Sequence, residues 1–226
     1  MTTIRSQEIP IFRAVAFDLL TALIDSWTLW IDIAGSDELG RAWRRESLRR
    51  VTTSGAYQPY EGIVREAADA SGVPRYRADA LLTKWIEGGL SPWPESSAVL
   101  SAIARIGLPT AVVTNCSQSL AEAAAETLEH RFDAIVSAEL AGVYKTDPRA
   151  YRAGLSALRI SDPADVLFVA GSPHDVPGAG AVGMKVYWSN RFQDAIPQGA
   201  PPPIRNEGNL LTLPELLLAS GKGPRS

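Results

Sequence analysis

Apolar residues in the second half of the chain come in short runs, separated by amphipathic stretches with helical spacing. The runs predict buried strands at residues 110–113, 134–136, 166–170 and 185–188. The stretches between and beside them predict helices at residues 95–106, 119–128, 148–158 and 176–182. An earlier run, FRAVAF at residues 12–17, adds one more strand. This alternation predicts an α/β fold, a doubly wound parallel sheet (Rossmann-like) with helices on both faces.

A block of purely helical pattern interrupts this alternation after the first predicted strand. The segment SDE at residues 36–38 has the composition of a helix N-terminus, and helical spacing continues at residues 60–70 and 78–86. The glycines and prolines of GGLSPWP, at residues 88–94, then end the pattern. We therefore expect a core made of residues 1–26 and 93–226, and a small helical cap domain of residues 27–92 inserted after the first strand.

Composition and charge exclude several classes of protein. The 226 residues include 22 Lys and Arg against 25 Asp and Glu, a net charge of −3, and no basic run exceeds two residues. Neither nucleic acid nor an anionic membrane surface is therefore an expected partner. No stretch approaches 18 consecutive apolar residues, and the N-terminal segment lacks the apolar run of a signal peptide, so we expect neither a membrane span nor export.

Cys116 is the only cysteine. A single cysteine excludes an internal disulfide and a cysteine-based zinc site. It also favours a reducing compartment, and we expect the protein to be cytoplasmic.

Polar side chains follow the predicted strands at their carboxyl ends. Each has an ordinary explanation when taken singly, such as capping a helix or carrying a solvated charge. The carboxyl ends of parallel strands, however, meet at one edge of the sheet, where ligands bind in folds of this kind. Together these residues predict a single site, and they are Asp18, Thr114, Asn115, Lys145, Ser172 and Asp175.

Four segments of the sequence resemble the motifs of the haloacid dehalogenase superfamily, and within it those of the L-2-haloacid dehalogenases. They are AFDLLTALIDS at 16–26, TNCS at 114–117, GVYKTDPRAY at 142–151 and VLFVAGSPHDVPGAGAVG at 166–183. The helical insertion is similar to the small mobile cap of that family. The resemblance implies a metal-independent hydrolase without a cofactor. Its reaction displaces halide from the 2-carbon of a short 2-haloalkanoic acid through an aspartyl ester and gives a 2-hydroxy acid.

The resemblance assigns catalytic roles to four residues. Asp18 takes the place of the covalent nucleophile, a role open to a carboxylate held in line with an electrophilic carbon in a dry site. Lys145 takes the place of the lysine that keeps this carboxylate ionised. Asp175 takes the place of the acid that orients or deprotonates the hydrolytic water, which Ser172 helps to position.

The resemblance also implies residues that bind the substrate, a small carboxylate, and its leaving group. Thr114 and nearby backbone N–H groups suit the substrate carboxylate, while Asn115 and Arg44, in AWRRESL at 42–48, suit the departing halide. The remaining expected contacts of the pocket are Leu20, Tyr151 and Trp27. A homodimer is a further implication of the resemblance.

Position 20 bears on the choice between reactions. Phosphatases of the superfamily carry a second Asp two residues after the nucleophile, which protonates the leaving oxygen, and they bind Mg²⁺ beside the nucleophile. This chain has Leu20 there, and a departing halide needs no proton. A Mg-dependent small-molecule phosphatase nevertheless stays one alternative, and a related hydrolase of another 2-substituted or strained-ring carboxylate stays a second.

Several residues depart from the dehalogenase pattern. Leu20 stands where Tyr is typical, Thr21 and Ala22 replace Gly-Thr, and Ala170 and Ser172 replace Ser and Asn. These changes predict a reshaped pocket and leave open a binding protein with a decayed site, although the joint presence of Asp18, Lys145 and Asp175 speaks against decay. For the other conspicuous side chains we expect packing roles: a hydrogen-bonded His174, a buried Cys116, and a cap core containing Trp43, Tyr60 and Trp85.

Overall fold

The structure is a computed structural model that describes residues 10–221, so the predicted outermost parts of the core, residues 1–9 and 222–226, lie outside the described residues. Six parallel strands form its central sheet in the order β5, β4, β1, β6, β7, β8. Because the first strand lies inside the sheet, the chain reverses its direction of winding there, which places a crevice at the carboxyl end of β1. The strands are β1 (Ala14–Phe17), β4 (Thr110–Thr114), β5 (Ala134–Ser137), β6 (Val166–Ala170), β7 (Lys185–Ser189) and β8 (Arg205–Glu207).

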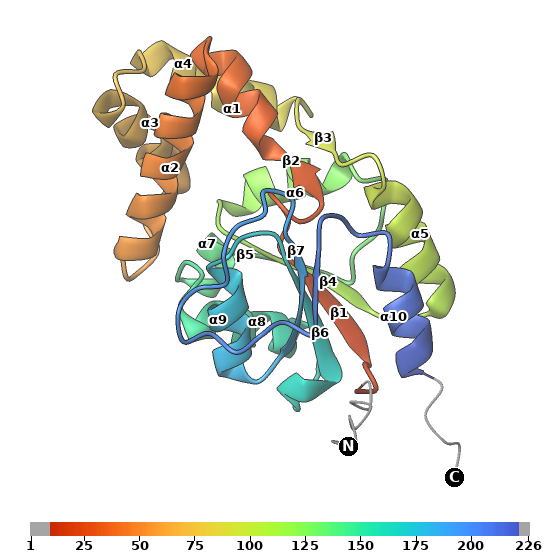
Figure 1. Ribbon diagram of the computed structural model, residues 1–226. Helices are drawn as coiled ribbons and strands as arrows, with labels where there is room; N and C mark the ends of the chain where they lie inside the picture. The colour runs from red at the N-terminus through yellow and green to blue at the C-terminus, as the bar shows by residue number, and fades with distance from the viewer. Residues whose placement is uncertain (1–9, 222–226) are drawn as a thin grey trace.

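Helices cover both faces of the sheet (Figure 1). Val15 and Phe17 of β1 pack into one hydrophobic layer and Ala14 and Ala16 into the other, as expected for a strand buried on both sides. The first layer contains residues of α5 (Ser96–Ile106), α6 (Gln118–Glu126) and α10 (Leu213–Ser220). The second contains residues of α8 (Pro148–Ala157) and α9 (Asp175–Val182), and the short elements α7 (Ala138–Ala141) and η1 (Pro163–Asp165) complete the core. The predicted doubly wound α/β fold is confirmed.

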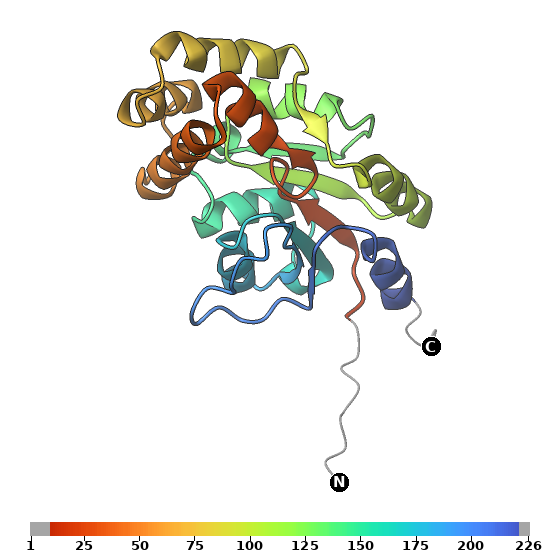
Figure 2. The same cartoon turned by 45° about the horizontal axis from the view of Figure 1, so that its top comes forward.

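Four helices form the cap above one end of the sheet (Figure 2). They are α1 (Ser26–Ala34), α2 (Asp37–Thr53), α3 (Tyr60–Ala70) and α4 (Arg75–Ile86). The Ser36 side chain accepts a hydrogen bond from the backbone N–H of Leu39 and so caps α2, as the sequence predicts. Trp30 and Trp43 pack edge to face inside the cap, with ring centroids 4.6 Å apart.

The cap joins the core through a two-stranded neck and rests on it at two further places. β2 (Ile24–Asp25) pairs antiparallel with β3 (Ser91–Pro92). Elsewhere, the Trp85 indole donates to the carbonyl oxygen of Leu120, and the Tyr144 hydroxyl donates to that of Gln58. These two strands lie next to the domain boundaries expected from the sequence, between residues 26 and 27 and between residues 92 and 93. The division of the chain into two domains at these positions stays a prediction.

The sequence pattern did not predict α1, α7, α10, β2, β3 or β8. The strand β8 reads RNE and is largely exposed, so no apolar alternation marks it, and only its pairing with β7 makes it a strand. No helix within residues 10–221 is long and apolar enough to cross a bilayer.

Candidate active site

Asp18 directly follows β1 at the topological switch of the sheet. Its Oδ2 atom accepts hydrogen bonds from the backbone N–H groups of Thr21 (3.2 Å) and Ala22 (3.3 Å). Gly171, at the end of β6, lies so close that a Cβ there would stand 2.8 Å from Oδ2 and 2.3 Å from the Ala22 nitrogen. The turn after β1 and the absence of a side chain at position 171 therefore fix the orientation of the carboxylate.

Lys145 connects the two buried carboxylates of the site. Its Nζ atom donates to Oδ1 of Asp18 at 2.8 Å and to Oδ2 of Asp175 at 3.1 Å, and all three side chains are buried. Burial alone would lower the pKa of Lys145, but the charges of Asp175 and Asp18 outweigh it and raise that pKa above its ordinary value. Lys145 is therefore a protonated cation at neutral pH.

The Asn115 side chain holds the backbone of Lys145 at both polar atoms. Its Oδ1 accepts from the Lys145 N–H at 2.7 Å, and its Nδ2 donates to the Lys145 carbonyl at 3.0 Å. The residue directly after β4 thus fixes the segment that carries the lysine. Asn115 also borders the cavity described below, and its Nδ2 atom carries a second N–H group besides the one that binds Lys145.

Asp175 is the first residue of α9, and the Tyr151 hydroxyl of α8 donates to its Oδ1 at 2.7 Å. Burial raises the pKa of Asp175 above its ordinary value and the charge of Asp18 adds to the rise, while Lys145 and the Tyr151 hydrogen bond oppose it. A carboxylate with a raised pKa in a closed site is suited to accept a proton from water.

A cavity of about 440 Å³ opens onto these groups between the core and the cap. Core residues supply its floor and cap residues, chiefly from α2, supply its wall. The lining residues are Asp18, Leu20, Thr21, Arg44, Arg45, Leu48, Arg49, Val51, Thr52, Tyr60, Asn115, Lys145, Thr146, Ser172, His174 and Asp175.

Arg44 is a buried cation without a carboxylate partner. Its guanidinium carbon lies 4.7 Å from the ring centroid of Trp27 and 5.6 Å from that of Trp30. Among residues 10–221 no carboxylate oxygen lies within 4 Å of the guanidinium, and Nε has no hydrogen-bond partner. Burial lowers its pKa, against the attraction of more distant acidic groups. A buried arginine of this kind is suited to bind an anion that arrives with the substrate or forms in the reaction.

The structure brings most of the predicted site residues together. Asp18, Lys145, Asp175, Ser172, Asn115, Arg44 and Leu20 all line the cavity. Thr114, Tyr151 and Trp27 lie behind this lining: the Thr114 hydroxyl is buried 3.9 Å from the sulfur of Cys116, Tyr151 supports Asp175, and Trp27 supports Arg44. Direct substrate contacts for these three stay predictions.

One expectation about packing residues is wrong, that for His174. His174 is not packed but exposed, and it lines the cavity, because the turn before α9 carries its side chain to the rim. Tyr60 is buried in the cap as predicted, yet it also forms part of the cavity wall. The other predictions hold: Trp43 and Trp85 are buried, and burial raises the pKa of the Cys116 thiol to about 12, which keeps it protonated.

Sequence reasoning missed the cavity residues contributed by α2 beyond Arg44. Arg45, Leu48, Arg49 and Thr52 follow Arg44 at helical spacing on the side that faces the core. The signal that could have identified them is helical spacing. Leu48 lies four residues after Arg44 and Arg49 four residues after Arg45, so a helix that places Arg44 at the site also brings these residues to the same side.

The donor groups of the site do not fit a Mg²⁺ ion between Asp18 and Asp175. Lys145 occupies the position between the two carboxylates. Within residues 10–221, moreover, His, Cys, Asp and Glu side chains form no group of three or more that could hold a metal ion.

The chain is an α/β protein with a doubly wound sheet and a helical cap, and the buried Asp18 that Lys145 bridges to Asp175 is its candidate nucleophile. Residues 8–183 match the family model of the haloacid dehalogenase-like hydrolases. This chain belongs to that family.

Several known proteins resemble most of the chain. The chain is 30% identical over 223 residues to (S)-2-haloacid dehalogenase 1 of a Pseudomonas species, an alignment that covers 91% of this chain and 96% of that one. It is also 30% identical to a phosphoserine phosphatase of Thermus thermophilus, over 72% of this chain and 68% of the other. A crystal structure described as a dehalogenase superposes with a TM-score of 0.81 at 25% identity and covers 91% and 97% of the two chains.

Proposed function

We propose that this protein is a hydrolase of the L-2-haloacid dehalogenase type, which converts a short 2-haloalkanoic acid to a 2-hydroxy acid. The observation that carries the proposal is the buried arrangement of Asp18, Lys145 and Asp175 beneath the unpartnered Arg44 guanidinium. It supplies a nucleophile, a base and an anion site, and Leu20 offers no proton donor for an oxygen leaving group.

In the first step, a carboxylate oxygen of Asp18 attacks the 2-carbon of the substrate. The new C–O bond forms an ester as the carbon–halogen bond breaks, and the halide departs with the bonding electron pair. Lys145 keeps Asp18 ionised, and the N–H groups of Thr21 and Ala22 hold its orientation. Arg44 receives the halide, whose negative charge compensates its buried guanidinium.

In the second step, water hydrolyses the ester. Asp175 takes a proton from the water as its oxygen attacks the ester carbonyl carbon, and Ser172, which lines the cavity, positions this water. As the acyl C–O bond breaks, the leaving alkoxide takes the second proton of the water from the new acyl hydroxyl. This releases the 2-hydroxy acid and restores the Asp18 carboxylate, and Asp175 passes its proton to solvent. Tyr151 orients Asp175 throughout.

The test is halide release from L- and D-2-chloropropionate in the presence of EDTA, with wild-type protein and Asp18→Asn. Release by the wild type alone is the expected result, and the comparison of the two enantiomers reveals the stereochemistry of the reaction. Absence of release at high protein concentration contradicts the proposal. Parallel assays with strained-ring carboxylates and with phosphate esters plus Mg²⁺ then identify the alternative activity.

The proposal extends to the compartment and the oligomeric state: a cytoplasmic protein that forms a homodimer. The single cysteine, Cys116, is buried and unpaired, which supports a reducing compartment, the cytoplasm, testable by cell fractionation. A homodimer is tested by light scattering of the purified protein.

A further inference from the structure

The cavity continues beyond the reacting groups along one side of α2. Arg45 and Arg49 line it together with Leu48 and Thr52. At about 440 Å³ the cavity falls within the ~300–1,000 Å³ range of pocket volumes that bind small molecules, and it is larger than a three-carbon haloacid requires. Space for an additional substrate group is therefore built into the wall formed by the cap.

The chemistry of this outer part is cationic. The only acidic side chains among the described lining residues are Asp18 and Asp175, and Lys145 is bonded to both. Arg45 and Arg49 lie four residues apart on the same side of α2, a spacing that places their side chains next to each other. Both guanidinium groups are therefore close enough to act on one ligand in the cavity.

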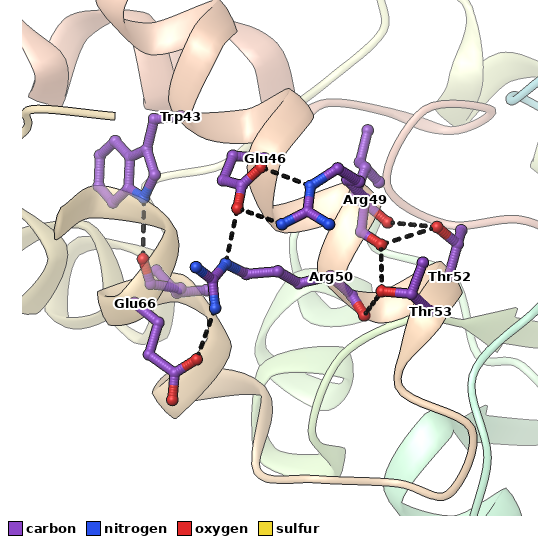
Figure 3. A network of polar contacts seen from close by, with 9 residues as sticks. Trp43, Glu46, Arg49, Arg50, Thr52, Thr53 and Glu66 are labelled. Carbon is purple, nitrogen blue, oxygen red and sulfur yellow. Dashed lines mark hydrogen bonds and ion pairs between the residues drawn. The ribbon is translucent and has the colours of Figure 1, made fainter. Parts of the chain in front are cut away.

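The two arginines differ in their partners. Arg49 forms two hydrogen bonds of 2.7 Å with Glu46, and the same carboxylate binds Arg50, which also pairs with Glu66 (Figure 3). Arg45 forms no ion pair with any described residue, and its side chain is exposed at the rim of the cavity. Among the exposed arginines of α2, Arg45 is thus the one whose charge is free for a ligand in the cavity, next to the buried Arg44.

We propose that Arg45, flanked by Arg49, binds a second carboxylate of the substrate, so that the protein prefers short 2-halodicarboxylates over 2-halomonocarboxylates. Arginine donates two parallel hydrogen bonds to a carboxylate, which makes it a suitable ligand for this group. Leu20, Leu48 and Val51 in the cavity lining suit the methylene carbons between the two ends. This inference rests on the proposed dehalogenation for the identity of the leaving group.

The test compares kcat/KM for L-2-chlorosuccinate and L-2-chlorobutanoate, which have equal carbon chains but differ in the second carboxylate. For Arg45→Gln, we expect about a fivefold loss with chlorosuccinate, because Arg45 is exposed and its ion pair is partly screened. The rate with chlorobutanoate should stay within about twofold, and Arg45→Lys should recover part of the loss because it restores the charge.

The matched control is Arg75→Gln. Arg75 lies at the exposed start of α4 and outside the cavity, so its loss removes the same charge from the cap without touching the proposed subsite. It should change neither rate by more than about twofold, which separates local binding from long-range attraction. Equal losses with both substrates in Arg45→Gln, or equal losses in both variants, would overturn the proposal.

Equilibrium binding separates failure of the subsite from failure of the proposed function. Succinate and butanoate carry no leaving group, and their affinities for the wild type and Arg45→Gln follow from isothermal titration calorimetry. Tighter binding of succinate that disappears in Arg45→Gln supports the subsite even if no haloacid releases halide. If chlorobutanoate releases halide through Asp18 but succinate binds no better than butanoate, the dehalogenase function stands and the second carboxylate site is refuted.

Discussion

The indole nitrogen Nε1 of Trp93 donates a hydrogen bond of 2.8 Å to the carbonyl oxygen of Thr21. Thr21 and its neighbour Ala22 supply the two backbone N–H groups that bind Oδ2 of Asp18. Trp93 belongs to the segment that returns from the cap, and the guanidinium of Arg191 stacks on its ring at 4.3 Å. The orientation of the candidate nucleophile is therefore linked to the neck between cap and core.

We predict that Trp93→Phe lowers kcat by about five- to tenfold with little change in KM. The substitution retains a ring but removes the N–H group that holds the Thr21 peptide, and the expected loss corresponds to one hydrogen bond of about 1 kcal/mol. The measurement is steady-state halide release.

The matched control for this prediction is Trp43→Phe. The Trp43 indole also donates to a backbone carbonyl, that of Val64, but within the cap. Both variants should lose unfolding free energy in urea titrations, about 1 kcal/mol for the hydrogen bond, and Trp43→Phe should lose more because its indole is fully buried. Only Trp93→Phe should lose kcat, and equal kcat values in the two variants would show that Trp93 has a structural role alone.

The closeness of Gly171 to Asp18 predicts that even a methyl group at position 171 lowers activity. A Cβ at position 171 would meet the Ala22 nitrogen at 2.3 Å and Asp18 Oδ2 at 2.8 Å, and the first of these belongs to the backbone. Gly171→Ala should therefore displace the turn and reduce kcat by about a hundredfold, as misplacement of reacting atoms by an ångström does. Halide release and a crystal structure of the variant measure both effects.

Gly62→Ala provides the comparison for that variant. Gly62 is a helical residue of α3, and a Cβ there would meet nothing within 4 Å. Alanine should stabilise the helix by about 0.5–1 kcal/mol and leave kcat unchanged. Full activity in Gly171→Ala would mean that the turn after β1 tolerates a shift that its contacts argue against.

The pH dependence of turnover should report Asp175. Asp175 must be ionised to accept the proton of water, and because burial raises its pKa, the acid limb of kcat should lie above the ordinary aspartate value of about 3.9. The Tyr151 hydroxyl stabilises the ionised form and thereby lowers this pKa. Tyr151→Phe should shift the limb to higher pH by about one unit, the size expected for a hydrogen bond to a charge.

A tyrosine outside the cavity serves as the reference for this shift. The Tyr187 hydroxyl donates to the carbonyl of Asn209 and contacts no residue of the site. Tyr187→Phe should keep the wild-type acid limb. A limb that stays in place or moves to lower pH in Tyr151→Phe would contradict the assignment of Asp175 as the base.

The sequence predicts the fold and the floor of the site because both depend on local patterns. Apolar runs mark β1 and β6, and the residues directly after them, such as Asp18, necessarily lie at one edge of a parallel sheet. Contacts that depend on the angle between cap and core are not encoded locally. The spacing from Asp18 does not indicate that Trp27 lies behind Arg44 rather than in the cavity, or that Arg45 lines its wall.

Local sequence patterns also do not predict which groups a side chain will bond to. No local pattern indicates that the Asn115 amide is bonded at both ends to the Lys145 backbone, 30 residues away. Its role as a donor to a leaving anion stays a prediction, because Nδ2 carries a second N–H group. The position of His174 was misjudged, because burial depends on where the turn before α9 points and not on the residue type.

The burial of Arg44 leads to a prediction in which stability and activity change in opposite directions. Its guanidinium has no carboxylate within 4 Å among the described residues, and its contacts are the faces of Trp27 and Trp30. An uncompensated buried charge destabilises a fold, whereas an apolar side chain of similar length packs in the same space at no electrostatic cost. The aromatic faces offset only part of the cost, about 0.5–2 kcal/mol for each cation–π contact.

Arg44→Met should therefore keep or raise the melting temperature while it reduces kcat for halide release by about 10²- to 10³-fold, the effect of losing one donor to a developing anion. Thermal unfolding with and without chloride gives an independent measure. Chloride that binds Arg44 stabilises the wild type by RT ln(1 + [Cl⁻]/Kd). The reference sample contains the salt of a larger anion at the same ionic strength. The stabilisation by chloride should be absent in Arg44→Met. A variant that is less stable but equally active would instead make Arg44 a structural residue of the cap, held there for its contacts with Trp27 and Trp30.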